Sequence, residues 1–123
     1  MQIDDSRPIW AQLVDEFRQR IVAGTWPPGG KLPSVRELAL DVGVNPNTVQ
    51  KALAEVDRLG LTVTERTAGR FVSTDAAAIA EARAALAATK VTDFAASMAA
   101  MGMTLEQASE LLAQLWNDRE DAS

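Results

Sequence analysis

The sequence predicts a mainly α-helical fold with a small β-hairpin, and three observations lead to this fold class. Apolar residues recur at helical spacing in five stretches of the chain. Capping residues and glycines stand at the ends of several of these stretches, where helices are expected to begin and end. Between the third and fourth stretches, short apolar runs flank a turn-prone segment at residues 67–69, which is typical of a hairpin.

The first helix is predicted between Pro8 and Gly24. Its apolar members follow the helical period and are Trp10, Leu13, Val14, Phe17 and Ile21. The next stretch, residues 25–33, is rich in proline and glycine and can form only an ordered connection. Trp26 and Leu32 are the expected anchors of this connection in the core.

The second and third helices form a closely spaced pair. Ser34 and Glu37 form a capping box at the start of the second helix, and Gly43 suits the left-handed conformation that ends it. Asn45 and Pro46 supply the N-cap and first-turn proline of the third helix. The two apolar stripes are Val35, Leu38, Ala39 and Val42, then Val49, Ala52, Leu53 and Val56. Because the break between them is so short, the helices must cross steeply, as in a helix-turn-helix.

A β-hairpin is expected after Gly60. Its alternating apolar residues are Leu61, Val63, Phe71 and Val72, on either side of the turn at residues 67–69. Three helices followed by a hairpin is the winged form of the helix-turn-helix. We therefore expect residues 1–75 to form a winged helix-turn-helix domain.

Residues 76–123 are expected to form a two-helix dimerisation region. The composition becomes alanine-rich at Ala76, and an unbroken helix to Met101 would be about 39 Å long, although a change of register near Thr89 suggests a break or bend. Thr104 caps the last helix, whose polar end from residue 117 is expected to fray. Such apolar helices need the winged domain, a partner chain or both to cover them. The residues assigned to dimerisation are Ile79, Leu86, Val91, Phe94, Met98, Met101, Leu112, Leu115 and Trp116.

Composition argues against an enzyme. The 123-residue chain has no histidine, cysteine or tyrosine, so a general acid, base or nucleophile would have to come from carboxylates or lysines scattered on polar faces. We expect no metal site and no cofactor, since zinc-binding spacing and a glycine-rich nucleotide loop are both missing. With no signal peptide and no apolar run of membrane-spanning length, a cytoplasmic protein is expected.

The net charge of −5 initially argues against a nucleic-acid partner, which normally leaves a basic footprint. The distribution of charged residues along the chain weakens that objection. Between residues 31 and 70 there are six basic residues and five acidic ones, and the acidic excess lies mainly at the two ends of the chain.

Asn47, Lys51, Ala54 and Arg58 on the third helix point away from its apolar stripe, and Thr48 and Gln50 lie on the flanks near its N-terminal end. Asn47 and Gln50 can pair with adenine, and Lys51 can donate to guanine or phosphate. The free NH groups of the helix N-terminus suit a phosphate oxygen. Taken singly these residues would be read as an ordinary solvated face, but their position on a steep helix pair favours DNA recognition. Arg36, near the start of the second helix, is favoured as a phosphate clamp because that helix crosses the DNA backbone in this motif. The weaker candidates for phosphate contact are Lys31, Arg66 and Arg70.

The run from Pro8 to Val72 resembles the winged domain of the GntR family of bacterial transcription regulators. The motifs G-x-W-x-P-G-x-x-L-P-S-x-R-x-L-A, V-N-P-N-T-V and A-L-x-E-x-x-x-x-G-L occur in order at family spacing. The short C-terminal part resembles the YtrA-type branch. The resemblance implies a homodimer that binds an inverted-repeat operator, usually as a repressor.

The resemblance also implies which residues contact DNA, namely Arg36, Asn45, Asn47, Thr48, Gln50 and the hairpin tip. Many relatives have Gly-Arg-Gly at that tip, whereas this chain has Thr67, Ala68 and Gly69, so the arginine that would enter the minor groove is absent. Arg66 or Arg70 could substitute by touching phosphate. Pro46 stands where other branches have an arginine, which leaves specificity mainly with Asn47, Thr48, Gln50 and Lys51.

The function predicted from the sequence is that of a dimeric, sequence-specific DNA-binding regulator. The alternative is a winged-helix module for protein–protein interaction, kept off DNA by its acidic balance. A small-molecule effector could bind at a subunit interface, although the appendage is too small for an obvious pocket.

Overall fold

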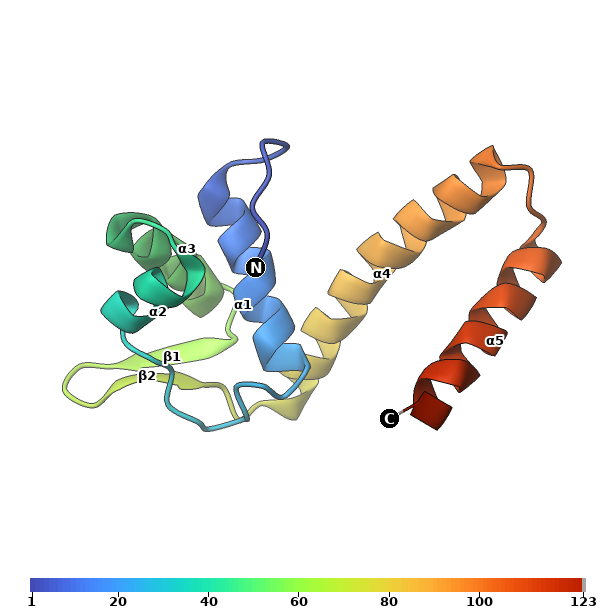
Figure 1. Ribbon diagram of the computed structural model, residues 1–123. Coiled ribbons are helices and arrows are strands. Elements are labelled where there is room, and N and C mark those ends of the chain that lie inside the picture. Colours follow the sequence, from blue (N-terminus) through green and yellow to red (C-terminus); the bar gives the residue numbers. More distant parts are fainter. Residues whose placement is uncertain (123) are drawn as a thin grey trace. The chain divides into compact units, whose positions relative to one another are not determined.

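The computed structural model describes residues 1–122, which form five α-helices and one two-stranded antiparallel sheet (Figure 1). This confirms the predicted fold class. The elements in chain order are α1 (Ile9–Val22), α2 (Val35–Val42), α3 (Pro46–Arg58), β1 (Thr62–Glu65), β2 (Gly69–Val72), α4 (Ala76–Ala100) and α5 (Leu105–Ala122).

The chain divides into two compact units, the first spanning Met1–Leu86 and the second beginning at Ala87. The first unit thus extends past the boundary predicted at residue 75. The reason is that Ile79 and Ala82 of α4 are buried in its core, and Leu86 packs against the same core. The assignment of Ile79 to dimerisation is therefore wrong, and Leu86 is already partly covered by its own chain.

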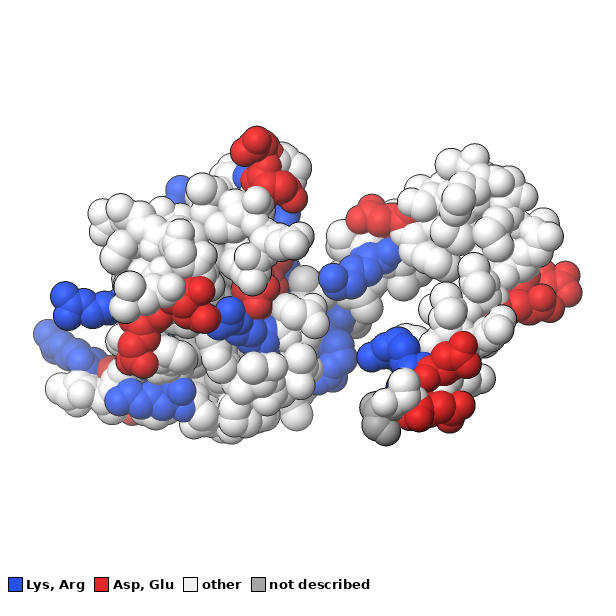
Figure 2. All heavy atoms as spheres, viewed as in Figure 1, with Lys and Arg blue, Asp and Glu red and all other residues white. Residues whose placement is uncertain are grey.

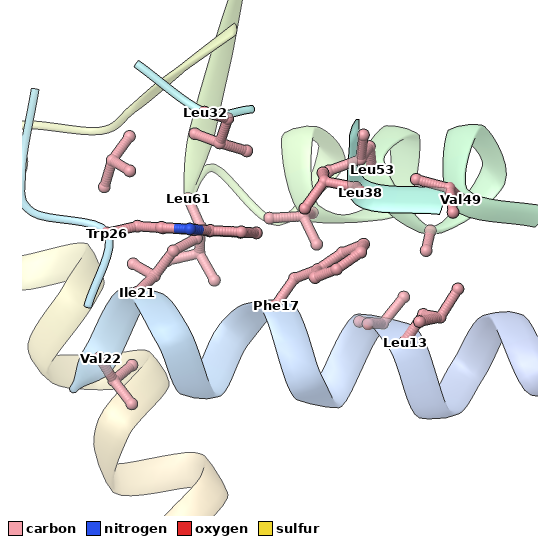
Figure 3. Close-up of a cluster of buried hydrophobic side chains, with 14 of the residues drawn as sticks. Leu13, Phe17, Ile21, Val22, Trp26, Leu32, Leu38, Val49, Leu53 and Leu61 are labelled. Atoms are coloured by element: carbon pink, nitrogen blue, oxygen red, sulfur yellow. The ribbon is translucent and has the colours of Figure 1, made fainter. Parts of the chain in front are cut away.

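The core of the first unit lies between α1 and the helix pair. Leu13, Phe17 and Ile21 of α1 point toward Leu38, Val49 and Leu53 of α2 and α3, and Trp26, Leu32 and Leu61 lie at the other end (Figure 3). The Phe17 and Trp26 rings are 5.5 Å apart between centroids. Both anchors predicted for the connection, Trp26 and Leu32, are buried. This core fixes how α3 is presented to solvent.

The caps of the helix pair form as the sequence predicts. The Glu37 backbone NH donates to Ser34 Oγ at 3.1 Å, and the Ser34 NH donates to Glu37 Oε1 at 3.3 Å, which completes the capping box. Gly43 ends α2 with φ of 69°, a left-handed conformation that costs a glycine little. The tight turn that follows brings α3 across α2.

The hairpin pairs Thr62 with Val72 and Glu65 with Gly69. A feature not predicted from the sequence is that the connection before α2 also pairs with β2. Lys31 forms an isolated antiparallel bridge with Phe71. The wing is therefore bounded on its β2 side by a third extended segment.

The second unit is helical. The α4 helix runs through Thr89 without interruption, so the break suggested there is not present. At the start of α5, Thr104 Oγ1 accepts the Gln107 NH at 3.1 Å, and the Thr104 NH donates to the Gln107 side chain at 3.0 Å. The end of α5, expected to fray from residue 117, is helical to Ala122.

Between the C-terminal part of α4 and α5 lies an apolar groove of about 380 Å³. Phe94, Met98, Leu105 and Leu112 are among its lining residues. Ala108 is buried, whereas the larger apolar side chains around it are mostly exposed. This unit on its own therefore leaves most of its apolar surface in water.

Candidate nucleic-acid interface

The buried stripe of α3 sets which side chains reach solvent. Val49, Ala52, Leu53 and Val56 are all at most 1 % exposed. Because the helix has 3.6 residues per turn, this burial turns Asn47, Gln50 and Lys51 outward, and all three are exposed, with Thr48 half-buried on the flank. The outward orientation predicted for Asn47 and Lys51 is confirmed, and Gln50, expected on the flank, is exposed as well.

Asn45 forms the N-cap of α3. Its Oδ1 accepts the Asn47 backbone NH at 2.8 Å, which satisfies one of the free NH groups at the start of the helix. The side-chain carbonyl is thus committed to the cap, and only the amide NH₂ is left for another partner. Asn45 therefore stabilises the N-terminal turn of α3, whether or not it also contacts DNA.

A polar groove of about 840 Å³ lies between the start of α2, α3 and the wing. Its lining brings together residues far apart in sequence, including Lys31 of the connection, Gln50 of α3 and Arg66 of the hairpin turn. Glu37 and Glu65 also line it. Arg36 is exposed on the first turn of α2 but does not line the groove.

Arg70 is held by Asp57 of α3. Its Nε lies 3.1 Å from Asp57 Oδ1, and its Nη2 lies 3.1 Å from Oδ2. The same carboxylate accepts hydrogen bonds from the Thr62 hydroxyl and, at 2.7 Å, from the Thr64 hydroxyl. The ion pair is largely shielded, with the Arg70 and Asp57 side chains 14 % and 27 % exposed. Arg70 therefore joins both strands of the wing to α3 and is a less available phosphate contact than the sequence suggested.

Burial opposes the ionisation of Asp57 and is the largest single influence on it. The hydrogen bonds from Thr62, Thr64 and Arg70 together outweigh burial and hold the pKa of this carboxyl below its ordinary value. Asp57 is thus a stable anion at neutral pH, and the attachment of the wing is charged.

Lys51 is held by an aromatic ring of α1. Its Nζ lies 4.6 Å from the centroid of the Trp10 ring, a cation–π contact. This contact keeps the ammonium group beside the outer face of α3 without neutralising it.

Basic residues of the first unit fall into two groups by their partners within residues 1–122. One group forms ion pairs with carboxylates, and its members are Arg7, Arg18, Arg20, Arg58 and Arg70. The other group has no carboxylate within 4 Å in that part of the chain, and its members are Lys31, Arg36, Lys51, Arg66 and Arg83. Of these, Arg83 instead donates to the Val22 carbonyl at 2.9 Å.

The four remaining unpaired cations belong to α2, α3, the wing turn and the connection beside it. Figure 2 shows basic side chains protruding at the end of the first unit where the hairpin tip and the start of α2 lie, with acidic side chains close by. We call Lys31, Arg36, Lys51 and Arg66 the unpaired cations of the interface. Their charge is free to meet an anion.

The roles of two residues of this site are not predicted from the sequence. Asp57 is one of the five acidic residues between residues 31 and 70, and Trp10 is expected only as an apolar residue of the first helix. A signal for Asp57 was present, because Thr62 and Thr64 lie two apart and so share one face of β1. No sequence period linked Trp10 to Lys51.

Within residues 1–122 there is no cluster of three acidic side chains that could hold a metal ion. No helix in that range is both long enough and apolar enough to cross a membrane.

A capped helix pair on a three-helix core, a wing beside it and unpaired cations on the exposed side define a class of protein. These are the features of a winged helix-turn-helix DNA-binding transcription regulator. The profile of the bacterial regulatory proteins of the gntR family matches residues 10–72, so the chain belongs to that family.

Two relatives from Bacillus subtilis show how far the similarity extends. The HTH-type transcriptional regulator YhcF is 38 % identical over 109 residues, which cover 89 % of this chain and 90 % of that protein. The HTH-type transcriptional repressor YtrA is 44 % identical over 78 residues, which cover 62 % of this chain and 60 % of that protein.

Two solved structures superpose on this chain. A GntR family transcriptional regulator from Listeria monocytogenes superposes with a TM-score of 0.81 at 34 % identity, covering 91 % of this chain and 98 % of that one. The DNA-binding domain of AraR in complex with operator ORR3 superposes with a TM-score of 0.53 at 29 % identity, covering 59 % of this chain and 88 % of that one.

Proposed function

We propose that the protein is a YtrA-type transcriptional repressor that binds an inverted-repeat operator as a homodimer. The observation that carries this proposal is the distribution of ion pairs in the first unit. Elsewhere in the unit carboxylates pair with Arg7, Arg18, Arg20, Arg58 and Arg70, and Arg83 donates to a backbone carbonyl, whereas Lys31, Arg36, Lys51 and Arg66 keep their charge unpaired. A surface built for phosphate needs such cations, because binding gains free energy by replacing the counterions of DNA.

In this proposal α3 enters the major groove with its N-terminal end. Asn47 and Gln50, both exposed, reach base edges, where an amide side chain can pair with adenine. Thr48 contacts a base edge or phosphate from the flank. Arg36 and Arg66 bind phosphates on either side and fix the register without reading sequence.

The dimer would form through the second unit. Val91, Met101 and Leu115 are between 53 % and 65 % exposed, and Trp116 is 53 % exposed. Phe94, Met98 and Leu112 line the apolar groove of the same unit. Contiguous apolar surface of this kind on a small unit is typical of an interface. A second copy supplies the same surface, as an isologous twofold contact requires.

Two of the comparisons support the repressor and operator parts of the proposal. YtrA is by name a repressor, and the AraR domain that this chain resembles was captured on an operator. A twofold dimer would place two α3 helices on half-sites about 34 to 36 Å apart, or a multiple of that distance.

The test is a binding titration on two duplexes, the promoter region of the protein's own operon and a mixed-sequence duplex of equal length. Wild type should prefer the promoter. Gln50→Ala should lose that preference, while Arg36→Ala should weaken binding to both duplexes and reduce the salt slope by about 1. Gln114→Ala on α5 and Arg58→Ala, which removes a cation already paired with Glu55, are the matched controls and should bind as wild type does.

Equal affinity of wild type for both duplexes at physiological salt would contradict specific recognition. The absence of a shift even at low salt would favour the protein-interaction module instead. Light scattering tests the dimer separately, with Leu115→Glu expected to give a monomer of unchanged helix content. A wild-type monomer at micromolar concentration would contradict the dimer.

A further inference from the structure

Lys31 lies on a segment that is fastened to the wing through its backbone. The Gly29 NH donates to the Val72 carbonyl at 3.0 Å, and the Val72 NH donates to the Gly30 carbonyl at 2.9 Å. One residue beyond Lys31, the Leu32 NH donates to the Arg70 carbonyl at 2.8 Å. The backbone position of Lys31 is therefore set from both sides by β2.

The side chain of Lys31 lies across Gly69, at the start of β2. A Cβ placed on Gly69 would come within 2.9 Å of Lys31 Cε, closer than a carbon normally approaches another, so a side chain at this position would displace the end of the lysine. Gly69 also has φ of 111°, a conformation that residues other than glycine rarely adopt. Because Gly69 has no side chain, the methylene chain of Lys31 can lie across it and extend toward the hairpin turn.

The ammonium group of Lys31 is available to a ligand. Lys31 is exposed and lines the polar groove together with Gln50 and Arg66. Glu37 and Glu65 line the same groove, yet no carboxylate within residues 1–122 lies within 4 Å of the Lys31 nitrogen. The wing itself offers one unpaired cation, Arg66, since Arg70 is paired with Asp57 and the turn residue Ala68 is uncharged.

We infer that Lys31 binds a DNA phosphate beside the wing and adds a second positive charge to that of Arg66 in the hairpin turn. The inference rests on the proposed function, because it assumes that α3 and the wing face DNA. A lysine acts here as a point charge, so its contribution is independent of base sequence. The wing contact of this protein thus comes partly from the connection before α2 and not from the hairpin alone.

The experiment compares salt dependence for wild type, Lys31→Met and Lys90→Met on the promoter and mixed-sequence duplexes. Methionine keeps an unbranched stem over Gly69 and removes only the charge. Lys90 is an exposed lysine of α4 in the second unit and serves as the matched control. Each lost phosphate contact should lower the slope of log K against log salt by about 0.9. Between about 50 and 200 mM salt, the advantage of wild type over Lys31→Met should therefore shrink about 3.5-fold per contact.

The expected result is a smaller slope for Lys31→Met on both duplexes, recovery of the slope in Lys31→Arg, and wild-type behaviour of Lys90→Met. Melting temperatures should be equal, which separates loss of charge from loss of fold. A wild-type slope for Lys31→Met would overturn the inference even if wild type still prefers the promoter. A wild type that shows no such preference would overturn the proposed function instead, and the two failures are thus distinguishable.

Discussion

The attachment of the wing to α3 depends on one carboxylate, so Asp57→Asn should loosen it. The substitution keeps the shape of the side chain and removes its charge. In wild type this group accepts two contacts from Arg70 at 3.1 Å and hydrogen bonds from two threonines. Asparagine keeps only one acceptor oxygen, so in this geometry it can accept from one of the two threonine hydroxyls, because Thr62 donates to Oδ1 and Thr64 to Oδ2. Arg70, whose side chain is only 14 % exposed, would lose its counter-charge.

The expected loss of stability depends on how exposed the Asp57–Arg70 ion pair is to solvent. Removing one partner of a fully buried ion pair costs about 3 to 5 kcal/mol, and removing an exposed one costs about 0 to 1 kcal/mol. With side chains 14 % and 27 % exposed, this pair lies between the two cases. We expect Asp57→Asn to lower the free energy of unfolding by about 1.5 to 3 kcal/mol, the range for hydrogen bonds to charged groups.

The assay is urea unfolding of wild type, Asp57→Asn and Glu55→Gln. Glu55→Gln makes the same chemical change on the same helix, but it removes a pair with Arg58, whose side chain is 69 % exposed. Its effect should be small. A cycle with Arg70→Met should show that the Asp57 and Arg70 losses are not additive. Equal destabilisation by Asp57→Asn and Glu55→Gln, or additive losses in the cycle, would refute the claim that this network holds the wing.

Three further predictions concern the same unit. Ile79→Ala should lower the free energy of unfolding by about 2 to 4 kcal/mol, since Ile79 is 6 % exposed, without changing the oligomeric state seen by light scattering. Asn45→Ala should cost about 1 kcal/mol in urea unfolding through the lost cap of α3. The pKa of Asp57 is lowered on folding, so its stabilisation is present above its unfolded pKa of about 3.9 and is lost as pH falls through the lower folded value. The stability gap between wild type and Asp57→Asn should therefore be constant from pH 5 to 7 and shrink below about pH 4; a gap that closes above pH 5 would contradict the lowered pKa.

The helix pair was predictable because its determinants are local. Ser34, Glu37, Gly43 and Asn45 each act within a few residues of themselves, and the structure places each in its predicted cap. The outward orientation of Asn47 and Lys51 followed equally from the period of the buried stripe. Helix caps and apolar periods depend on residues close together in the sequence, so they can be recognised in a single sequence without an alignment.

Contacts between distant residues were not predictable in this way. Arg70 reaches Asp57 across 13 positions, and Lys31 packs on Gly69 only because the connection pairs with β2. In the alanine-rich helix α4, the surface that covers each apolar residue was likewise not predictable. Its apolar stripe changes register near Thr89 but is apolar on both sides of that point, yet Ile79 faces the core of the first unit and Val91 faces solvent. A period shows that one side of a helix is apolar, but it does not say which surface covers each turn.

The net charge of −5 is compatible with DNA binding once the pairing of individual charges is considered. In the first unit Asp15, Glu16, Asp41, Glu55 and Asp57 are all within ion-pair distance of arginines. Exposed charges interact over a Debye length of about 8 Å at physiological ionic strength, so what an approaching phosphate meets depends on the immediate neighbours of each cation. The salt slope of binding should therefore follow the number of unpaired cations at the interface. It should fall when Lys31 or Arg36 is neutralised and stay constant when Arg58 is, although all three substitutions change the net charge equally.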